Sequence, residues 1–233
     1  MTFYKLEATG NDFIFLIDND EKIDVKKLCD RKLGIGGDGL IHIDNLYNVT
    51  IYNADGSLAN MCGNGLRCAC KLINVLTNKV NVNFYINNHV IETKMVDENI
   101  AYVLMPSPMM ISYNTGYFVS LLNKHYIIFA NNIDNFSFSD ELIKISNDKQ
   151  CNVSVIEVIN RRQIKIRTYE YGVKETLSCG SASIACFFVC FMLDKVESNI
   201  QVINKGGTVS CFNKNNKYYL QGNVNFVYKG ELQ

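Results

Sequence analysis

A cysteine motif occurs twice in this chain of 233 residues, and the repeat constrains the fold more than any other feature. In each copy a cysteine is followed by glycine and a small polar residue, at Cys62–Asn64 and at Cys179–Ser181. Nine positions before each cysteine, a polar residue follows a tyrosine: Asn53 in the first copy and Glu170 in the second. The two cysteines are 117 positions apart, about half the chain, which predicts two related domains produced by duplication.

A second pair of similar segments supports the duplication. Residues 6–18 read LEATGNDFIFLID and residues 119–131 read VSLLNKHYIIFAN, each an apolar strand after a polar turn. Aligning Asn11 with Asn123 gives an offset of 112, close to that of the cysteines. The only two prolines, Pro106 and Pro108, lie between the copies and mark the domain junction. We therefore expect the first domain to span 1–106.

One segment is apolar on every face and predicts how each half packs. Residues 182–193 read ASIACFFVCFML, and a helix of this kind must be surrounded by protein. Each half also contains many short alternating segments that predict strands. We therefore expect an α+β fold of two pseudo-symmetric domains. Each would be a curled, mostly antiparallel, barrel-like sheet around a central helix, with a cysteine at the start of that helix.

Charge and hydropathy narrow the class of protein. The chain has 23 Lys and Arg against 23 Asp and Glu, so it lacks the basic surface that binds nucleic acid or anionic membranes. The longest apolar run, 184–193, is shorter than the roughly 18–20 residues of a membrane span. The first residues lack the apolar core of a signal peptide. We expect a soluble, cytoplasmic protein.

The nine cysteines raise the question of disulfides or metal. Their odd number and the missing secretion signal argue against a disulfide scaffold. The sequence has no Cys-x-x-Cys pair, and its three histidines are not clustered near the cysteines, so we expect no metal site. Four cysteines in apolar helical stretches are expected to be ordinary buried thiols: Cys68, Cys70, Cys186 and Cys190.

A glycine-rich segment, Gly34–Gly39, satisfies the G-x-G-x-x-G pattern of dinucleotide-binding proteins. That pattern requires a strand before it and a helix after it. Here a helical stretch, 24–33, comes before and an apolar strand, 40–43, comes after. The order is reversed, so we expect no nucleotide cofactor. We interpret the segment as a tight turn near the cleft across which the two cysteines are expected to face each other.

The cysteine turns predict a particular chemistry. A helix N-terminus carries unpaired N–H groups and a partial positive charge, so it binds anions. Such groups beside each sulfur would hold a carboxylate and stabilise the charge that develops when an amino acid loses its α-proton. The same field lowers the pKa of a cysteine thiol from about 8.5 towards neutrality. Two neighbouring sulfurs do not both ionise easily, which leaves one base and one acid.

Five segments match one family in order and spacing: ATGNDF (8–13), RKLGIGGDGL (31–40), YNADGSLANMCGNGLRC (52–68), VSLLNKHYIIF (119–129) and RTYEYGVKETLSCGS (167–181). Along essentially its full length the chain resembles the diaminopimelate epimerase family. The resemblance implies a cofactor-independent, two-base inversion at an α-carbon, from LL- to meso-diaminopimelate, in the synthesis of lysine and peptidoglycan precursors. It also implies a homodimer. It further implies that the strand near 224–229 returns to the first domain, so 222–233 would join 1–106 and leave 107–221 as the second.

The resemblance also assigns roles to residues. It makes Cys62 and Cys179 the acid/base pair, and it implies that Asn11 and Glu170 hold the α-amine. The reacting carboxylate would be bound by backbone groups at Gly63, Asn64, Gly180 and Ser181. Polar contacts to the far end of the substrate would come from Asn53, Asn123 and Asn152.

Three positions depart from the family pattern. Tyr171 stands where the family has an arginine that contacts the distal carboxylate, Lys124 replaces a usual proline, and Ala182 replaces the usual glycine or small residue. Arg167, Lys124 and Lys174 are the cations near enough in sequence to compensate for the missing arginine.

Two alternatives to a diaminopimelate epimerase stay open at this point. A racemase of another amino acid would need no distal cation. A thiol redox switch would need no catalysis at all, but it would also have no use for amine-binding residues such as Asn11 and Glu170.

Overall fold

Short segments with alternating buried and exposed side chains form many of the strands in this chain. Strand β6 (Asn81–Ile86), for example, buries every second residue. The computed structural model describes residues 1–18, 23–45, 47–113 and 115–232. The chain divides into two compact units: Met1–Val103 together with Gly222–Gln233, and Leu104–Gln221.

The first unit contains a six-stranded sheet in the order β18-β1-β2-β3-β4-β5. Its strands are β1 (Thr2–Ala8), β2 (Asn11–Ile17), β3 (Gly39–Ile43), β4 (Val49–Asn53), β5 (Leu58–Ala59) and β18 (Asn225–Glu231). All neighbours are antiparallel except β2 and β3. An antiparallel meander follows, formed by β6, β7 (His89–Asp97) and β8 (Ile100–Met105). The helices are α1 (Val25–Cys29) and α2 (Gly63–Thr77).

The second unit is built from a longer run of paired strands, β17-β16-β15-β13-β12-β11-β10-β9. These are β9 (Met109–Tyr113), β10 (Gly116–Ser120), β11 (Lys124–Phe129), β12 (Asn152–Asn160), β13 (Gln163–Glu170), β15 (Asn199–Asn204), β16 (Gly207–Lys214) and β17 (Lys217–Asn223). The short strand β14 (Lys174–Glu175) pairs with β13. The helices are η1 (Ile133–Asn135), α3 (Asp140–Lys149) and α4 (Gly180–Met192).

The two units repeat one order of elements. In the first unit β1 and β2 lead to α1, then β3, β4 and β5 follow, and then α2 and β6 to β8. In the second unit β10 and β11 lead to η1 and α3, then β12, β13 and β14 follow, and then α4 and β15 to β17. Strand β18 of the first unit and β9 of the second lie outside this series. The parallel pairing of β2 with β3 in the first unit recurs as the pairing of β11 with β12 in the second. The expected α+β fold of two similar halves is confirmed. In the described residues, however, the strand paths stay open and do not close into barrels.

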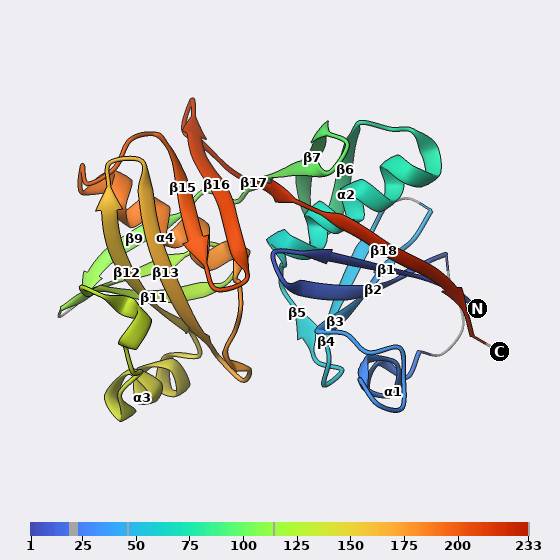
Figure 1. The fold of residues 1–233 in the computed structure, drawn as a ribbon, viewed down its shortest axis with the longest axis horizontal. Helices are drawn as coiled ribbons and strands as arrows, with labels where there is room; N and C mark the ends of the chain where they lie inside the picture. The colour runs from blue at the N-terminus through green and yellow to red at the C-terminus, as the bar shows by residue number, and fades with distance from the viewer. Residues whose placement is uncertain (19–22, 46, 114, 233) are drawn as a thin grey trace. The chain divides into compact units, whose positions relative to one another are not determined.

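Each unit curls its strands around one long helix (Figure 1). Helix α2 packs against β1, β2 and β18, and also against β6 and β7. Helix α4 contacts β10 to β13, β15 and β16, and it is buried from Gly180 to Cys190, as its apolar sequence predicts. Both helices begin immediately after a cysteine, and α4 starts two residues before the apolar segment 182–193.

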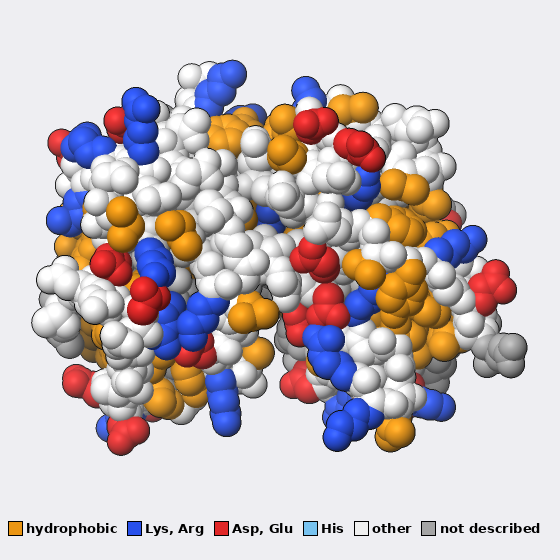
Figure 2. Space-filling view, in the orientation of Figure 1, with side chains coloured by type: hydrophobic (Ala, Val, Ile, Leu, Met, Phe, Trp, Pro, Cys, Tyr) orange, Lys and Arg blue, Asp and Glu red, His pale blue; other side chains and the backbone are white. Residues whose placement is uncertain are grey.

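The surface carries no single sign of charge on the face drawn in Figure 2, where basic and acidic side chains are interspersed. In the part of the chain that the structure describes, none of the helices has the length and apolar character needed to cross a membrane.

Candidate active site

Cys62 is the residue immediately before α2 and has extended backbone angles, φ −140° and ψ 107°. Its sulfur accepts a hydrogen bond from the backbone N–H of Gly65 at 3.3 Å, the role that a serine or aspartate oxygen often fills at a helix start. Glycine is needed at position 65 because a Cβ there would lie 2.5 Å from Cδ1 of buried Ile41. The half-buried thiol is therefore fixed at the positive end of a helix.

Asn11 lies beside this turn, at the start of β2. Its Oδ1 is 4.0 Å from Sγ of Cys62 and accepts a hydrogen bond from Nδ2 of Asn64 at 3.4 Å. Its Nδ2 donates to Oδ2 of Asp38 at 2.7 Å. Oδ1 of Asn64 accepts from the buried guanidinium of Arg67 at 2.7 Å. The structure thus brings Asn11, Cys62 and Asn64 into one cluster, with a carbonyl oxygen directed at the sulfur.

Cys179 has the same position at the start of α4, with φ −126° and ψ 111°, but its thiol is buried. Its sulfur lies 3.4 Å from Oγ of Ser181. Nδ2 of Asn152 donates to it at 3.9 Å. Both of these contacts are made by side-chain groups, whereas Cys62 accepts a backbone N–H.

Two predicted asparagines adjoin the Cys179 turn. Nδ2 of Asn123 donates to Oγ of Ser181 at 3.4 Å, and Oδ1 of Asn152 accepts the backbone N–H of Tyr171 at 3.0 Å. Asn152 therefore contacts Cys179 with one end of its amide and the turn after β13 with the other. Four predicted residues, Asn123, Asn152, Tyr171 and Ser181, are thus connected by hydrogen bonds around the sulfur of Cys179.

His125, in β11, is a buried neighbour of these residues that no sequence motif singled out. It pairs in register with Asn152 and is fully buried. None of the described residues hydrogen-bonds to either of its ring nitrogens. Burial lowers the pKa of His125 to about 3, so the imidazole is neutral at ordinary pH.

Glu170 and Tyr171 lie at the end of β13. Oε1 of Glu170 accepts a hydrogen bond from the hydroxyl of Thr176 at 2.6 Å, which orients the carboxylate. The side chain of Tyr171 is 45% exposed. Lys174, in the paired strand β14, is also exposed.

Arg167 does not replace the missing cation at position 171. Its guanidinium forms two hydrogen bonds to the carboxylate of Glu175, at 2.6 and 2.9 Å. Its NH1 also donates to the carbonyl oxygens of Ile133, Asp134 and Phe136. These contacts commit the charge of Arg167 to holding η1 and β14 against β13.

The four helical cysteines are buried thiols, as expected, and are not joined in disulfides. Burial raises the pKa of Cys70 to about 11 and that of Cys190 to about 12, so both stay protonated and unreactive. In residues 1–18, 23–45, 47–113 and 115–232, the side chains of His, Cys, Asp and Glu form no group that could hold a metal ion.

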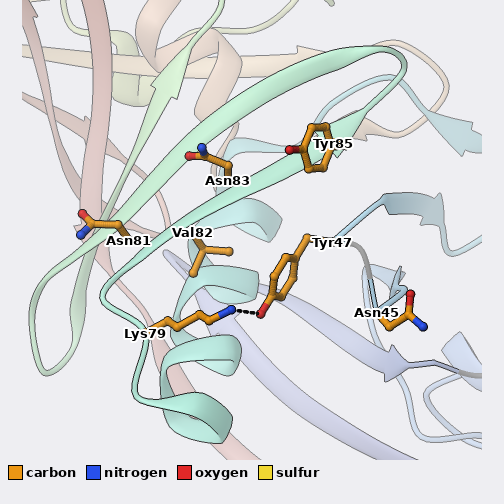
Figure 3. Close-up of a pocket in the computed structure, with 7 residues that line it drawn as sticks. All are labelled: Asn45, Tyr47, Lys79, Asn81, Val82, Asn83 and Tyr85. Atoms are coloured by element: carbon orange, nitrogen blue, oxygen red, sulfur yellow. Dashed lines mark hydrogen bonds between the residues drawn. The ribbon is translucent and has the colours of Figure 1, made fainter.

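Outside the Cys62 cluster, the first unit presents Asn53 and an open hollow. The amide of Asn53 donates to Oγ of Ser57 at 2.9 Å, within the turn between β4 and β5. The hollow, of about 450 Å³, lies between Tyr47 and strand β6 (Figure 3). Lys79 spans it and donates to Oη of Tyr47 at 2.8 Å. The hollow is lined by none of the predicted site residues.

The whole chain is similar in sequence to one enzyme family. The model of that family, described as diaminopimelate epimerase, matches residues 3–111 and 117–227. The chain belongs to the diaminopimelate epimerase family. A diaminopimelate epimerase of Campylobacter jejuni is 34% identical over 248 residues and covers 98% of both chains. One of Flavobacterium psychrophilum is 34% identical over 257 residues, covering 98% of this chain and 99% of the other.

The fold is shared more widely than the sequence. A predicted epimerase from Pseudomonas aeruginosa has a TM-score of 0.84 at 11% identity, covering 99% of this chain and 98% of that one. Membership of the diaminopimelate epimerase family makes this chain an isomerase with amino-acid epimerase activity and associates it with lysine biosynthesis. The redox-switch alternative is therefore set aside.

Among the residues that sequence reasoning did not single out, Thr176 and Asp38 each contact a predicted site residue. Thr176 holds Glu170, and Asp38 holds Asn11. Asp38 lies in the glycine-rich turn that we interpreted only as a tight turn. A usable signal was present, because a carboxylate in a turn with no other evident role is a candidate for contact with a nearby site.

Proposed function

We propose that this protein epimerises diaminopimelate by a two-base mechanism in which Cys62 and Cys179 exchange the α-proton without a cofactor. The observation that carries the proposal is the shared position of the two thiols. Each sulfur stands at the first residue before a helix, followed by glycine, while the chain's other helical cysteines are buried within helices. Only the two helix-start sulfurs lie where backbone N–H groups can hold an anionic substrate beside them.

In the proposed reaction one cysteine acts as thiolate and removes the α-proton, forming an S–H bond as the C–H bond breaks. The electron pair delocalises onto the substrate carboxylate. The backbone N–H groups of Gly63 and Asn64, and of Gly180 and Ser181, stabilise that charge. The other thiol then delivers its own proton to the opposite face of the carbon. After one turnover the two cysteines have exchanged protonation states, which leaves the enzyme ready to catalyse the reverse reaction.

The substrate amine binds oxygen acceptors in this proposal. An ammonium group has only donors, so it requires acceptors around it. Oδ1 of Asn11 faces the Cys62 turn and supplies one, and the carboxylate of Glu170 supplies a charged one. Because Thr176 already orients Glu170, the carboxylate loses little side-chain freedom when the amine binds.

The far end of the substrate determines which amino acid is used. Asn53, Asn123 and Asn152 are retained and support diaminopimelate, as do relatives of that name that cover nearly the whole chain. Tyr171 offers one neutral hydroxyl where an arginine would bind a carboxylate in two places. Of the three candidate cations, Arg167 is committed to Glu175, which leaves Lys124 and Lys174. We propose weaker binding of the distal carboxylate, with a racemase of another amino acid as the second candidate.

The deciding experiment is stereoinversion of LL-diaminopimelate in deuterium oxide by dialysed, chelator-treated protein. We expect meso product with deuterium at the inverted α-carbon, and loss of activity after alkylation of thiols. As a control, Cys190→Ala removes a buried thiol from α4, the helix that follows Cys179, and should retain full activity. Activity that disappears with the chelator and returns with added zinc would refute the cofactor-independent mechanism.

A further inference from the structure

The turn that carries Asp38 closes directly onto the start of β2. The backbone N–H of Asp38 donates to the carbonyl of Asp12 at 2.8 Å, and the backbone N–H of Asp12 donates to Oδ2 of Asp38 at 3.2 Å. Gly36 has φ +82°, a conformation that residues with side chains rarely adopt, and its carbonyl accepts from Nζ of Lys5. The glycines of this turn therefore serve to place one carboxylate beside Asn11.

The contact with Asp38 determines which end of the Asn11 side chain faces the cysteine. A carboxylate can only accept hydrogen bonds, so the 2.7 Å contact with Oδ2 of Asp38 must be made by the NH₂ group of Asn11. The carbonyl oxygen is thereby turned to the other side, towards Cys62 and Asn64. If the amide were reversed, it would present donors to a substrate amine that also has only donors.

A network of charges holds Asp38 itself. NH2 of Arg31 lies 2.8 Å from Oδ1 of Asp38 and 2.6 Å from Oδ1 of Asp12, and Lys5 lies 2.7 Å from Asp12. Burial would raise the pKa of Asp12, but hydrogen bonds from Arg31 and Lys5 lower it to about 2. The side chains of Arg31 and Asp38 are 59% and 40% exposed, and exposed ion pairs of this kind add little to stability. For the Arg31–Asp38 pair, orientation is thus a better account than stability.

We propose that Asp38 is a positioning residue that fixes the orientation of the Asn11 carboxamide, with Arg31 holding Asp38 in place. The inference rests on the proposed function, in which Asn11 accepts a hydrogen bond from the substrate amine. Asp38 acts through Asn11 and has no contact with substrate in this scheme.

The test is the variant Asp38→Asn, measured with LL-diaminopimelate. An amide at position 38 no longer imposes one orientation on Asn11, so KM should rise about 10-fold or more, while kcat changes less than about threefold. The urea midpoint of unfolding should stay close to the parental value. Arg31→Gln should raise KM by a smaller factor. As a control, Asp194→Asn removes an exposed carboxylate paired with Arg161 at 2.9 Å in the second unit and should leave both constants unchanged.

The double variant Asn11→Asp, Asp38→Asn separates orientation from folding. A carboxylate at position 11 presents oxygens to both sides, and the amide at position 38 then donates to it. This exchange should restore KM towards the parental value. A parental KM in Asp38→Asn would overturn the proposal. The proposal would also be overturned if Asp38→Asn lowered both the stability and kcat and the double variant did not restore them. If the parent itself fails to epimerise diaminopimelate, the proposed function is wrong before the role of Asp38 is reached.

Discussion

The two cysteine turns have nearly the same backbone and different surroundings. Cys62 and Cys179 both precede a helix in extended conformation, and both are followed by glycine. At the first turn the sulfur accepts a backbone N–H and faces the carbonyl oxygen of Asn11. At the second turn the sulfur of Cys179 contacts the hydroxyl of Ser181 and the amide nitrogen of Asn152. Duplication has thus preserved the local geometry of each thiol. Both neighbouring residues, Gly65 and Ser181, and distant ones, Asn11 and Asn152, make the two environments unequal.

Replacing each cysteine by alanine gives the largest expected effect and tests whether both turns act. General acid or base groups contribute about 10²–10⁴-fold, so Cys62→Ala and Cys179→Ala should each lose inversion by at least that factor. The remaining cysteine can still remove the proton from one face of the substrate α-carbon and return it there. Each variant should therefore exchange the α-hydrogen of only one stereoisomer, and the two variants should select opposite ones, as followed by NMR in deuterium oxide. A variant that inverts at more than about a tenth of the parental rate would exclude its cysteine from the reaction.

Tyr171→Arg sharpens the comparison at the second turn. An arginine there can form a two-point contact with a distal carboxylate, so kcat/KM for diaminopimelate should rise about 10- to 150-fold. The value for a monocarboxylic amino acid should not rise, and Tyr171→Phe should have little effect on either substrate. A parent enzyme that turns over a monocarboxylic amino acid far faster than diaminopimelate would contradict the preferred substrate.

His125→Phe tests a difference between the repeats, because Phe13 occupies the corresponding position of the first unit. The folded state keeps His125 neutral down to about pH 3, whereas an exposed histidine in the unfolded chain binds a proton near pH 6.5. Below pH 6.5 the unfolded state therefore gains protons that the folded state does not. The parent should lose stability on the order of 1 kcal/mol per pH unit as pH falls from about 6.5 towards 3.

The measurement is the urea midpoint at pH 7 and pH 5. The midpoint of the parent should fall more between these values than that of His125→Phe. His89→Phe removes an exposed histidine and should behave like the parent. Equal falls in all three proteins would show that His125 is not the group responsible.

The smallest effect concerns the third residue after each cysteine. Gly65→Ala would place a Cβ against Ile41 and 3.5 Å from the sulfur of Cys62, so it should destabilise by about 1 kcal/mol despite the better helix propensity of alanine. At the corresponding position the second helix already has Ala182, fully buried. Ala182→Gly should cost about 0.5–1 kcal/mol from helix propensity, and the loss of a buried methyl group adds to that cost. Urea unfolding measures both, and a stabilised Gly65→Ala would mean that Ile41 repacks freely.

Local sequence predicted what lies within a few residues of each cysteine. The helix starts followed from Cys-Gly, and the central burial of α4 followed from its uniform apolar sequence. The fold class followed from the repeat. Strand β9 was not predicted, because its segment follows two prolines and looked like a linker, and its side chains at Met109 and Ile111 are largely exposed.

Contacts between distant residues were beyond sequence reasoning. Asp38 is 27 residues from Asn11, and although its carboxylate made it a candidate for contact with a nearby site, nothing in either segment identifies Asn11 as its partner. Arg167 was one of three candidate cations, and nothing in the sequence indicated its carbonyl and carboxylate partners, more than thirty residues away in the case of η1. The roles of the candidate residues in substrate binding stay predictions that the variants above test.

The pairing of β18 with β1 has a consequence for the order of events during synthesis. The amino group of Met1 donates to the carbonyl of Leu232 at 2.9 Å, across a separation of 231 residues. The second unit is one continuous segment and can fold as soon as it is made, whereas the first must wait for residues that follow it. Until then β1 has an unpaired edge, which is a site for association with other chains. Closing so long a loop is slow, so the pairing of these two strands should be the late step of folding.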